Sequence, residues 1–148
     1  GADFGFHFHP HFAHKFHLES SYSYIKTEDE QGESFPLTPQ PRLNTSLRYE
    51  FEHEGKVELK NISLQHQYYF EQNNVAQFET KSPAYHLINL GVNIEMGAKK
   101  EFVVKAGVTN LLNESYISHL SGLKNIGLLN PGRNVYLSIK YQLKTKSK

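Results

Sequence analysis

The chain has 148 residues, about the length of one domain. Its 16 Lys and Arg residues nearly balance its 15 Asp and Glu residues, and this +1 charge argues against a nucleic-acid-binding surface, which needs a basic patch. Cys is absent, which excludes disulfides, thiolate catalysis and zinc–thiolate sites. No run approaches the roughly 18 apolar residues of a membrane-spanning helix. A membrane β-barrel stays open, because half of each of its strands faces a polar lumen.

Apolar and polar residues alternate with a period of two along most of the chain, which predicts β-strands. The first predicted strand covers residues 4–8 and the second covers residues 16–24. Residues 27–41 form a polar stretch with three prolines, which is typical of a long loop. A third strand is predicted over residues 43–51, and residues 53–56 supply a short turn.

The fourth run, residues 57–70, changes phase within the strand. Val57 and Leu59 share one parity, whereas Ile62 and Leu64 share the other. One inserted residue has this effect, so the pattern predicts a β-bulge near Lys60 and Asn61.

The rest of the chain repeats the arrangement. A long polar loop at residues 71–84 precedes a predicted strand over residues 88–96. A short turn, residues 97–100, leads into a strand over residues 102–109. A third long loop, residues 112–132, leads to the last strand, residues 135–143, and a Lys/Ser tail follows at 144–148.

The sequence therefore predicts an all-β fold: an antiparallel meander of about seven long strands, most of them about 10 to 14 residues long, against a mode of roughly 5 to 6. Short turns alternate with long loops, as in outer-membrane barrels. Strands of about 9 to 11 residues also suffice to cross the hydrocarbon layer. Two alternatives remain: a complete small outer-membrane barrel serving as an adhesin or structural protein, and a soluble β-sandwich that binds a ligand.

One face of the predicted strands is expected to contact lipid. Its members share one parity within each strand, so a shift of one residue would turn all of them to the opposite face. Charged residues of the opposite parity, such as Arg48, Glu50, Glu52 and Lys105, would line a wet channel. The predicted lipid-facing residues are Phe16, Leu18, Tyr22, Tyr24, Leu43, Leu47, Tyr49, Phe51, Ile88, Leu90, Val92, Phe102, Val104, Val108, Leu137, Ile139 and Tyr141.

Three segments carry a resemblance to a known family. Residues 104–116 contain an alternating strand followed by Asn110-Leu111-Leu112-Asn113 and then Tyr116. Residues 131–136 read Pro-Gly-Arg-Asn-Val-Tyr, and residues 37–44 contain Pro-Gln-Pro-Arg-Leu-Asn. In this order, the segments resemble the last strands of TonB-dependent outer-membrane receptors. The matching family-motif residues are Asn110, Leu111, Asn113, Tyr116, Gly132, Arg133 and Asn134.

The resemblance implies that residues 1–148 are the carboxy-terminal portion of a 22-stranded transmembrane β-barrel whose plug domain lies outside this sequence. Its implied function is import of a scarce solute (siderophore, haem, cobalamin, metal chelate or glycan) across the outer membrane of a Gram-negative bacterium. Energy would come from the TonB system through the plug. We expect the motif residues to shape turns, and we expect no cofactor and no nucleic-acid partner. In such receptors the last strand normally ends the protein, so the tail at 144–148 departs from the pattern.

Five of the nine histidines fall between residues 7 and 17. His7 and His9 share a strand face, and His11, His14 and His17 follow across a turn. Imidazoles can bind zinc, copper or nickel, although a turn offers little of the supporting shell that a tight site needs. We therefore expect a solvated polar turn, with metal binding by these histidines, weak at most, as the alternative.

Motifs of catalysis are absent from the sequence. It has no Gly-rich phosphate loop, no His-Glu-x-x-His and no nucleophile elbow. Asp occurs only at Asp3 and Asp29, and the adjacent Ser118 and His119 would point to opposite sides of an extended segment. The sequence therefore predicts a protein that is not an enzyme.

Overall fold

The computed structural model describes residues 1–143, so the predicted tail at 144–148 lies outside the described residues. Alternating aromatic, β-branched and polar residues fold into strands because they suit a pleated surface with two different faces. Two short 3₁₀ turns, η1 (His11–Ala13) and η2 (Lys124–Ile126), interrupt the connections. The strands are β1 (Ala2–Phe8), β2 (Phe16–Tyr24), β3 (Arg42–Glu50), β4 (Val57–Tyr69), β5 (Tyr85–Met96), β6 (Phe102–Thr109) and β7 (Asn134–Tyr141).

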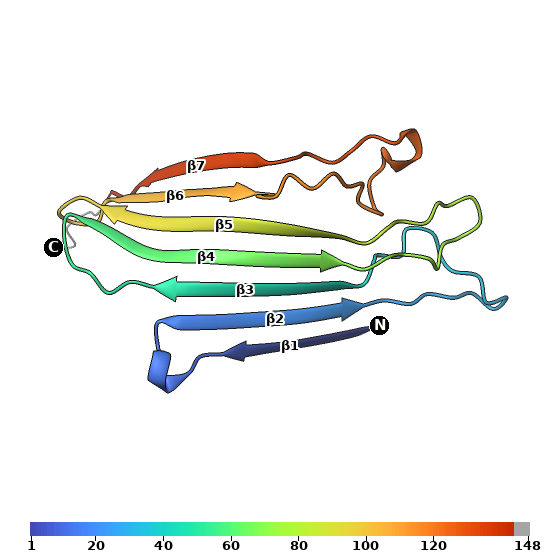
Figure 1. Ribbon diagram of the computed structural model, residues 1–148, viewed down its shortest axis with the longest axis horizontal. Coiled ribbons are helices and arrows are strands. Elements are labelled where there is room, and N and C mark those ends of the chain that lie inside the picture. The colour runs from blue at the N-terminus through green and yellow to red at the C-terminus, as the bar shows by residue number, and fades with distance from the viewer. Residues whose placement is uncertain (144–148) are drawn as a thin grey trace.

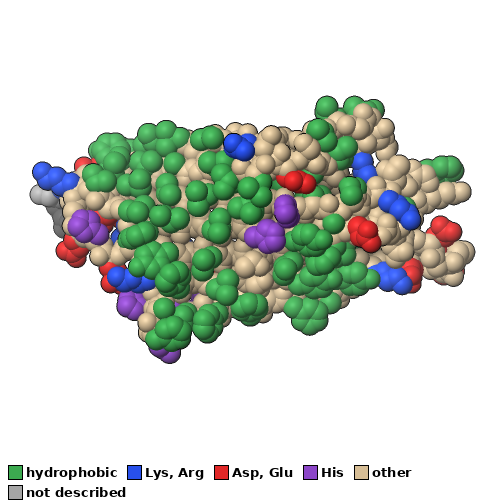
Figure 2. All heavy atoms as spheres, viewed as in Figure 1, with side chains coloured by type: hydrophobic (Ala, Val, Ile, Leu, Met, Phe, Trp, Pro, Cys, Tyr) green, Lys and Arg blue, Asp and Glu red, His purple; other side chains and the backbone are tan. Residues whose placement is uncertain are grey.

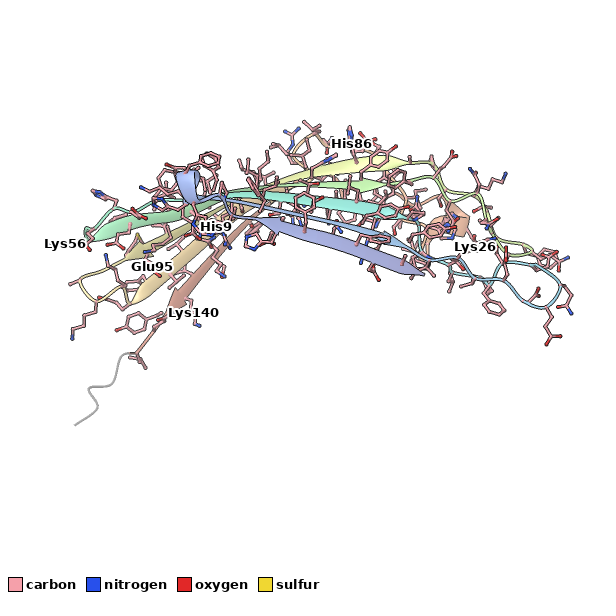
Figure 3. All side chains as sticks on the ribbon, turned by 90° about the horizontal axis from the view of Figure 1, so that it is seen from below. His9, Lys26, Lys56, His86, Glu95 and Lys140 are labelled. Atoms are coloured by element: carbon pink, nitrogen blue, oxygen red, sulfur yellow. The ribbon has the colours of Figure 1, made fainter. Side chains whose placement is uncertain are left out.

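The seven strands form one antiparallel sheet in chain order, which confirms the predicted meander (Figure 1). The three long connections gather at one end of the sheet, which we call the loop end, and the short turns gather at the other, the turn end (Figure 1). Seen from its side, the sheet is a single curved layer, with His86 on one side of it (Figure 3). Residues 1–143 contain no second sheet, so the structure does not support the β-sandwich alternative.

The predicted strand lengths are partly wrong. The strands contain 7 to 13 residues, and only β4 and β5 exceed nine. At some strand ends the alternation continues past the last residue of the strand. Beyond β3, for example, the N–H of Phe51 still donates to the carbonyl of Lys60 at 2.9 Å. In contrast, β5 begins at Tyr85, three residues before the alternation at Ile88 predicts.

The predicted β-bulge is confirmed. The register between β4 and β5 shifts between Leu59 and Asn61, so Lys60 is the extra residue. The bulge lets Val57 and Leu59 share a face with Ile62 and Leu64 despite their opposite parity.

Every predicted lipid-facing residue lies on one face of the sheet, which we call the apolar face. Directly opposite residues of an antiparallel pair project from the same face, so the register identifies its members. The apolar face is exposed, and hydrophobic side chains cover the strands on the side shown in Figure 2. One row of opposed residues crosses from β2 to β7: Leu18, Leu47, Leu64, Leu90, Val108 and Val135.

The described residues bury few apolar side chains. Tyr85 and Leu87 are the buried hydrophobic residues among residues 1–143. Both belong to the opposite face, where the loop end folds over the sheet. In this part of the chain, no helix has the length and apolar character to cross a membrane.

Candidate functional site

The second face of the sheet, which we call the polar face, carries amides and hydroxyls. Asn93 donates to the side-chain oxygen of Asn61 at 2.6 Å, and Asn89 donates to that of Gln65 at 3.0 Å. Gln67 donates to Asn44 at 3.3 Å. These side chains pair across neighbouring strands, so the polar face presents an organised, mostly uncharged hydrogen-bonding wall to water or a polar partner.

Charged groups of the polar face concentrate toward the turn end. Arg48 Nε lies 3.4 Å from Glu50 Oε1, and His17 Nε2 lies 3.5 Å from the same oxygen. A hollow of about 220 Å³ is lined by His17, Glu19 and Arg48, together with serines and asparagines of β3 to β5. Lys105 pairs with Asn93 on this face as well. The predicted separation of Arg48, Glu50 and Lys105 from the apolar face is therefore confirmed.

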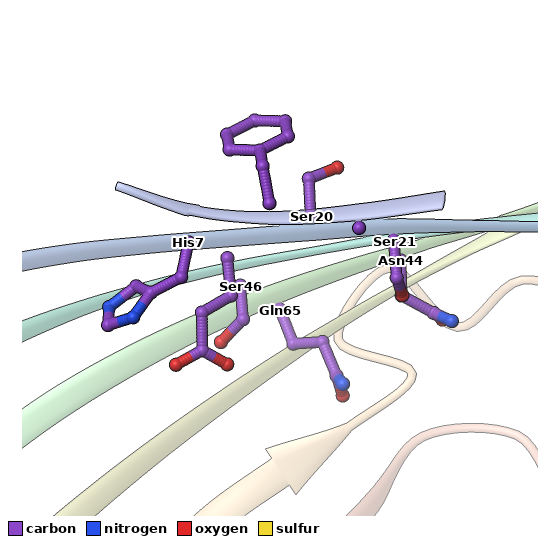
Figure 4. Close-up of a pocket in the computed structure, with 9 residues that line it drawn as sticks. His7, Ser20, Ser21, Asn44, Ser46 and Gln65 are labelled. Carbon is purple, nitrogen blue, oxygen red and sulfur yellow. The ribbon is translucent and has the colours of Figure 1, made fainter. Parts of the chain in front are cut away.

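A second hollow, of about 470 Å³, adjoins the first on the polar face. His7, Ser21, Asn44, Ser46 and Gln65 line it, and Glu19 lines both hollows. Figure 4 shows the side chains of His7, Ser46 and Gln65 on one side of the sheet, with Ser20 on the other.

The structure brings together three of the five predicted histidines. The ring of His17 stacks on that of His9 with centroids 4.3 Å apart, and lies 5.8 Å from that of His7. His7 and His9 lie 6.3 Å apart with nearly parallel planes. His14 instead contacts Glu52 at 3.2 Å. Within residues 1–143, no three His, Cys, Asp or Glu side chains stand ready to coordinate a metal ion.

The family-motif residues join the β6–β7 connection to its strands. Asn110 and Asn113 adopt positive φ angles of 50° and 57°, a conformation that Asn tolerates well. The side chain of Asn110 closes a turn, because it accepts from the N–H of Glu114 at 2.8 Å and donates to the Glu114 carbonyl at 2.9 Å. The N–H of Leu111 donates to the Ile88 carbonyl at 2.7 Å.

The motif at residues 131–136 contacts the motif at residues 104–116 through Asn113. Its side-chain oxygen accepts from the N–H of Arg133 at 2.9 Å. A Cβ on Gly132 would lie 2.6 Å from that oxygen, so the close approach requires glycine. Asn134 opens β7 opposite Thr109. These contacts agree with a turn-shaping role.

Tyr116 contributes an aromatic stack on the polar face. Its ring lies 4.5 Å from that of Tyr85, which lies 4.6 Å from that of Tyr69. The stack fixes the β6–β7 connection against β4 and β5 and closes the loop end of the polar face.

A buried polar cluster at the loop end is the part of the site that sequence reasoning missed. His119, whose side chain is 1% exposed, lies with Nδ1 2.9 Å from Ser82 Oγ and 3.0 Å from Lys124 Nζ. Its Nε2 lies 3.2 Å from Glu79 Oε1. Its backbone N–H donates to Gln40 at 3.4 Å. We call these five residues the loop cluster.

The loop cluster holds His119 neutral. Burial lowers the pKa of His119, and the ammonium of Lys124 lowers it further, while Glu79 opposes both effects. Because Ser82 and Lys124 both approach Nδ1 as donors, the ring proton resides on Nε2, facing Glu79. Ser82 is buried at 1% exposure, so this Ser–His–Glu contact connects loops and does not present a nucleophile. No sequence spacing relates these residues, since three separate loops supply them.

The fold defines a class: a single antiparallel meander with one apolar and one polar face and with its long loops at one end. No protein-family model matches the sequence. Among solved structures, the chain is similar to the copper transporter OprC, with a TM-score of 0.77 and 17% sequence identity. The match covers 94% of this chain and 22% of OprC, so the chain spans about a fifth of that protein. At this identity the similarity concerns the fold alone.

Proposed function

We propose that the chain is the carboxy-terminal barrel segment of a TonB-dependent receptor that imports a scarce solute across the outer membrane. The observation that carries the proposal is the division of seven strands into one exposed, mainly apolar face and one hydrogen-bonding, mainly polar face. A lipid bilayer solvates the first face and a water-filled lumen solvates the second. The fold similarity to a transporter supports the same assignment.

The loop end is the proposed side of solute entry. A hollow of about 240 Å³ lies there, and its lining includes Leu37, Phe78, Glu79, His119 and Lys124. Apolar side chains beside one cation and one carboxylate suit a compact solute that carries both apolar and polar groups. In this proposal the TonB system supplies energy through the plug domain, and outer-membrane lipid is the partner of the apolar face.

The lipid-facing assignment is tested with single tryptophans, because the chain contains none. Leu64 and Gln65 are neighbours on opposite faces of β4, and Leu137 and Ser138 are neighbours on opposite faces of β7. In vesicles of brominated phosphatidylcholine, we expect strong quenching for Leu64→Trp and Leu137→Trp and little for Gln65→Trp and Ser138→Trp. Equal quenching within each pair would contradict the assignment.

Energised import is tested separately in cells that carry the complete receptor polypeptide. Uptake of the solute should stop when the TonB protein is removed and return when it is restored. Unchanged uptake without TonB would contradict this part of the proposal and leave a passive barrel.

A further inference from the structure

The histidine trio on the polar face, formed by His7, His9 and His17, has features that the fold does not use. His17 belongs to β2, and its side chain is only 12% exposed. Neither of its ring nitrogens has a hydrogen-bond partner. An unsatisfied buried polar group destabilises a fold, so a fold normally keeps one only where something else engages it.

From this trio, we propose that His7, His9 and His17 bind a divalent transition-metal ion on the polar face at the turn end. Imidazole nitrogen suits Cu²⁺, Ni²⁺ and Zn²⁺, so the ligand class is a first-row ion late in the series. The site goes beyond the transport proposal and does not depend on it, since three histidines of two neighbouring strands compose it.

The hydrogen bond of His9 prepares its ring for coordination. Its Nε2 lies 2.6 Å from the carbonyl oxygen of His14, so Nε2 carries the proton and Nδ1 keeps a lone pair. Metal-binding histidines characteristically donate their second N–H to a carbonyl or a carboxylate in this way. The carboxylate of Glu50 lies 3.5 Å from Nε2 of His17, at ion-pair distance but without a hydrogen bond, so both ring nitrogens of His17 remain available to an ion.

A small movement of the rings completes the site. The rings of His9 and His17 are stacked with centroids 4.3 Å apart and an interplanar angle of 18°, so their in-plane lone pairs converge on one ion only after the rings tilt. His7 and His9 are exposed, so their rings can tilt inward without disturbing the sheet. This required tilt agrees with weak rather than tight binding.

The surrounding charges permit a cation. Arg48 lies opposite His17 in the register, but its Nε is 3.4 Å from the Glu50 carboxylate, which offsets its charge. Glu19 of β2 lies opposite His7 and lines both hollows of the polar face, so a second carboxylate stands beside the site.

The test titrates the untagged full chain in detergent micelles with Cu²⁺ or Ni²⁺ alone, followed by calorimetry and, for Cu²⁺, by electron paramagnetic resonance. We expect imidazole nitrogen couplings, and we expect His9→Ala and His17→Ala each to weaken binding about tenfold or more. His11→Ala is the matched control, because His11 belongs to the same histidine-rich segment but not to the trio.

His9 follows the last residue of β1, so His9→Ala keeps the strand ladder intact even if His17→Ala fails to fold. Unchanged affinity in His9→Ala, an equal loss in His11→Ala, or the absence of nitrogen couplings at saturating Cu²⁺ would overturn the proposal. Circular dichroism of each variant verifies the strand content.

Discussion

The side-chain oxygen of Asn113 accepts a hydrogen bond from the backbone N–H of Arg133, at 2.9 Å. This bond joins the start of the β6–β7 connection to its end, across twenty residues of chain. Asn113 also adopts a φ of 57°, so its residue type matters both for the acceptor and for the backbone conformation.

Replacement of this residue should weaken the connection. Asn113→Ala removes the acceptor oxygen. It also places at a positive φ a side chain that cannot hydrogen-bond to the nearby backbone, so we expect the free energy of unfolding to fall by about 1–3 kcal/mol. Urea-induced unfolding in detergent measures the change. Asn113→Asp is the matched control, because it keeps the acceptor oxygen and tolerates the same φ. An equal loss in both variants would show that the hydrogen bond contributes nothing.

The loop cluster should make stability depend on pH. The pKa of His119 is lowered in the fold from an ordinary value of 6.5, so between the two pKa values the unfolded chain binds more protons. The contribution of the neutral His119 ring to the free energy of unfolding is therefore complete above pH 6.5. It declines as the pH falls from 6.5 toward the lowered pKa. Lys124 and Glu79 are the charged groups that face the ring.

Unfolding of the wild type and of His119→Gln across this pH interval measures the effect. The difference in stability between the two proteins should shrink as the pH falls, because the wild type alone loses the contribution of a neutral imidazole. Carboxylates elsewhere titrate equally in both proteins and cancel. A difference that stays constant with pH would contradict the prediction.

Gly107 should not accept a side chain. A Cβ there would lie 2.5 Å from Tyr136 Oη and against the carbonyl oxygen of Leu90. Gly107→Ala should therefore destabilise the sheet by about 1–3 kcal/mol, as overpacking does. Gly122→Ala is the control, because nothing lies within 4 Å of a Cβ at that position.

Tyr136 is one source of the conflict at Gly107. Adding Tyr136→Phe to Gly107→Ala should recover part of the loss, because it removes the hydroxyl that the new methyl group meets. Full additivity of the two substitutions in a double-mutant cycle would argue against this contact.

The isolated 148-residue chain should associate in plain buffer. Its two edge strands, β1 and β7, do not pair with each other, and exposed edges act as templates for further pairing. Its apolar face also exposes many large hydrophobic side chains, among them Leu47, Leu64 and Leu90, whereas a soluble monomer tolerates contiguous apolar surface of only a few hundred Å². Light scattering should report aggregates that detergent disperses. A monodisperse monomer without detergent would contradict the prediction.

Much of the fold is determined by the sequence itself. The side-chain period of two assigns Leu47 and Leu64 to one face and Arg48 and Gln65 to the other, because neighbouring residues of a strand point in opposite directions. The phase change around Lys60 reveals the bulge for the same reason. Prolines and polar runs locate the long loops, because they interrupt the alternation. Strand ends are less certain, since both the alternation and a backbone hydrogen bond continue at Phe51, one residue past the end of β3.

Tertiary structure decides what the sequence pattern cannot contain. His11 and His14 are nearer to His9 in sequence than His17 is, yet it is the ring of His17 that stacks on the ring of His9, because β2 pairs back along β1. Likewise, Gln40, Ser82 and His119 come from three loops and meet only when the sheet brings its loop end together. Alternation is a local property that each strand expresses alone, whereas these contacts depend on the register between strands distant in sequence.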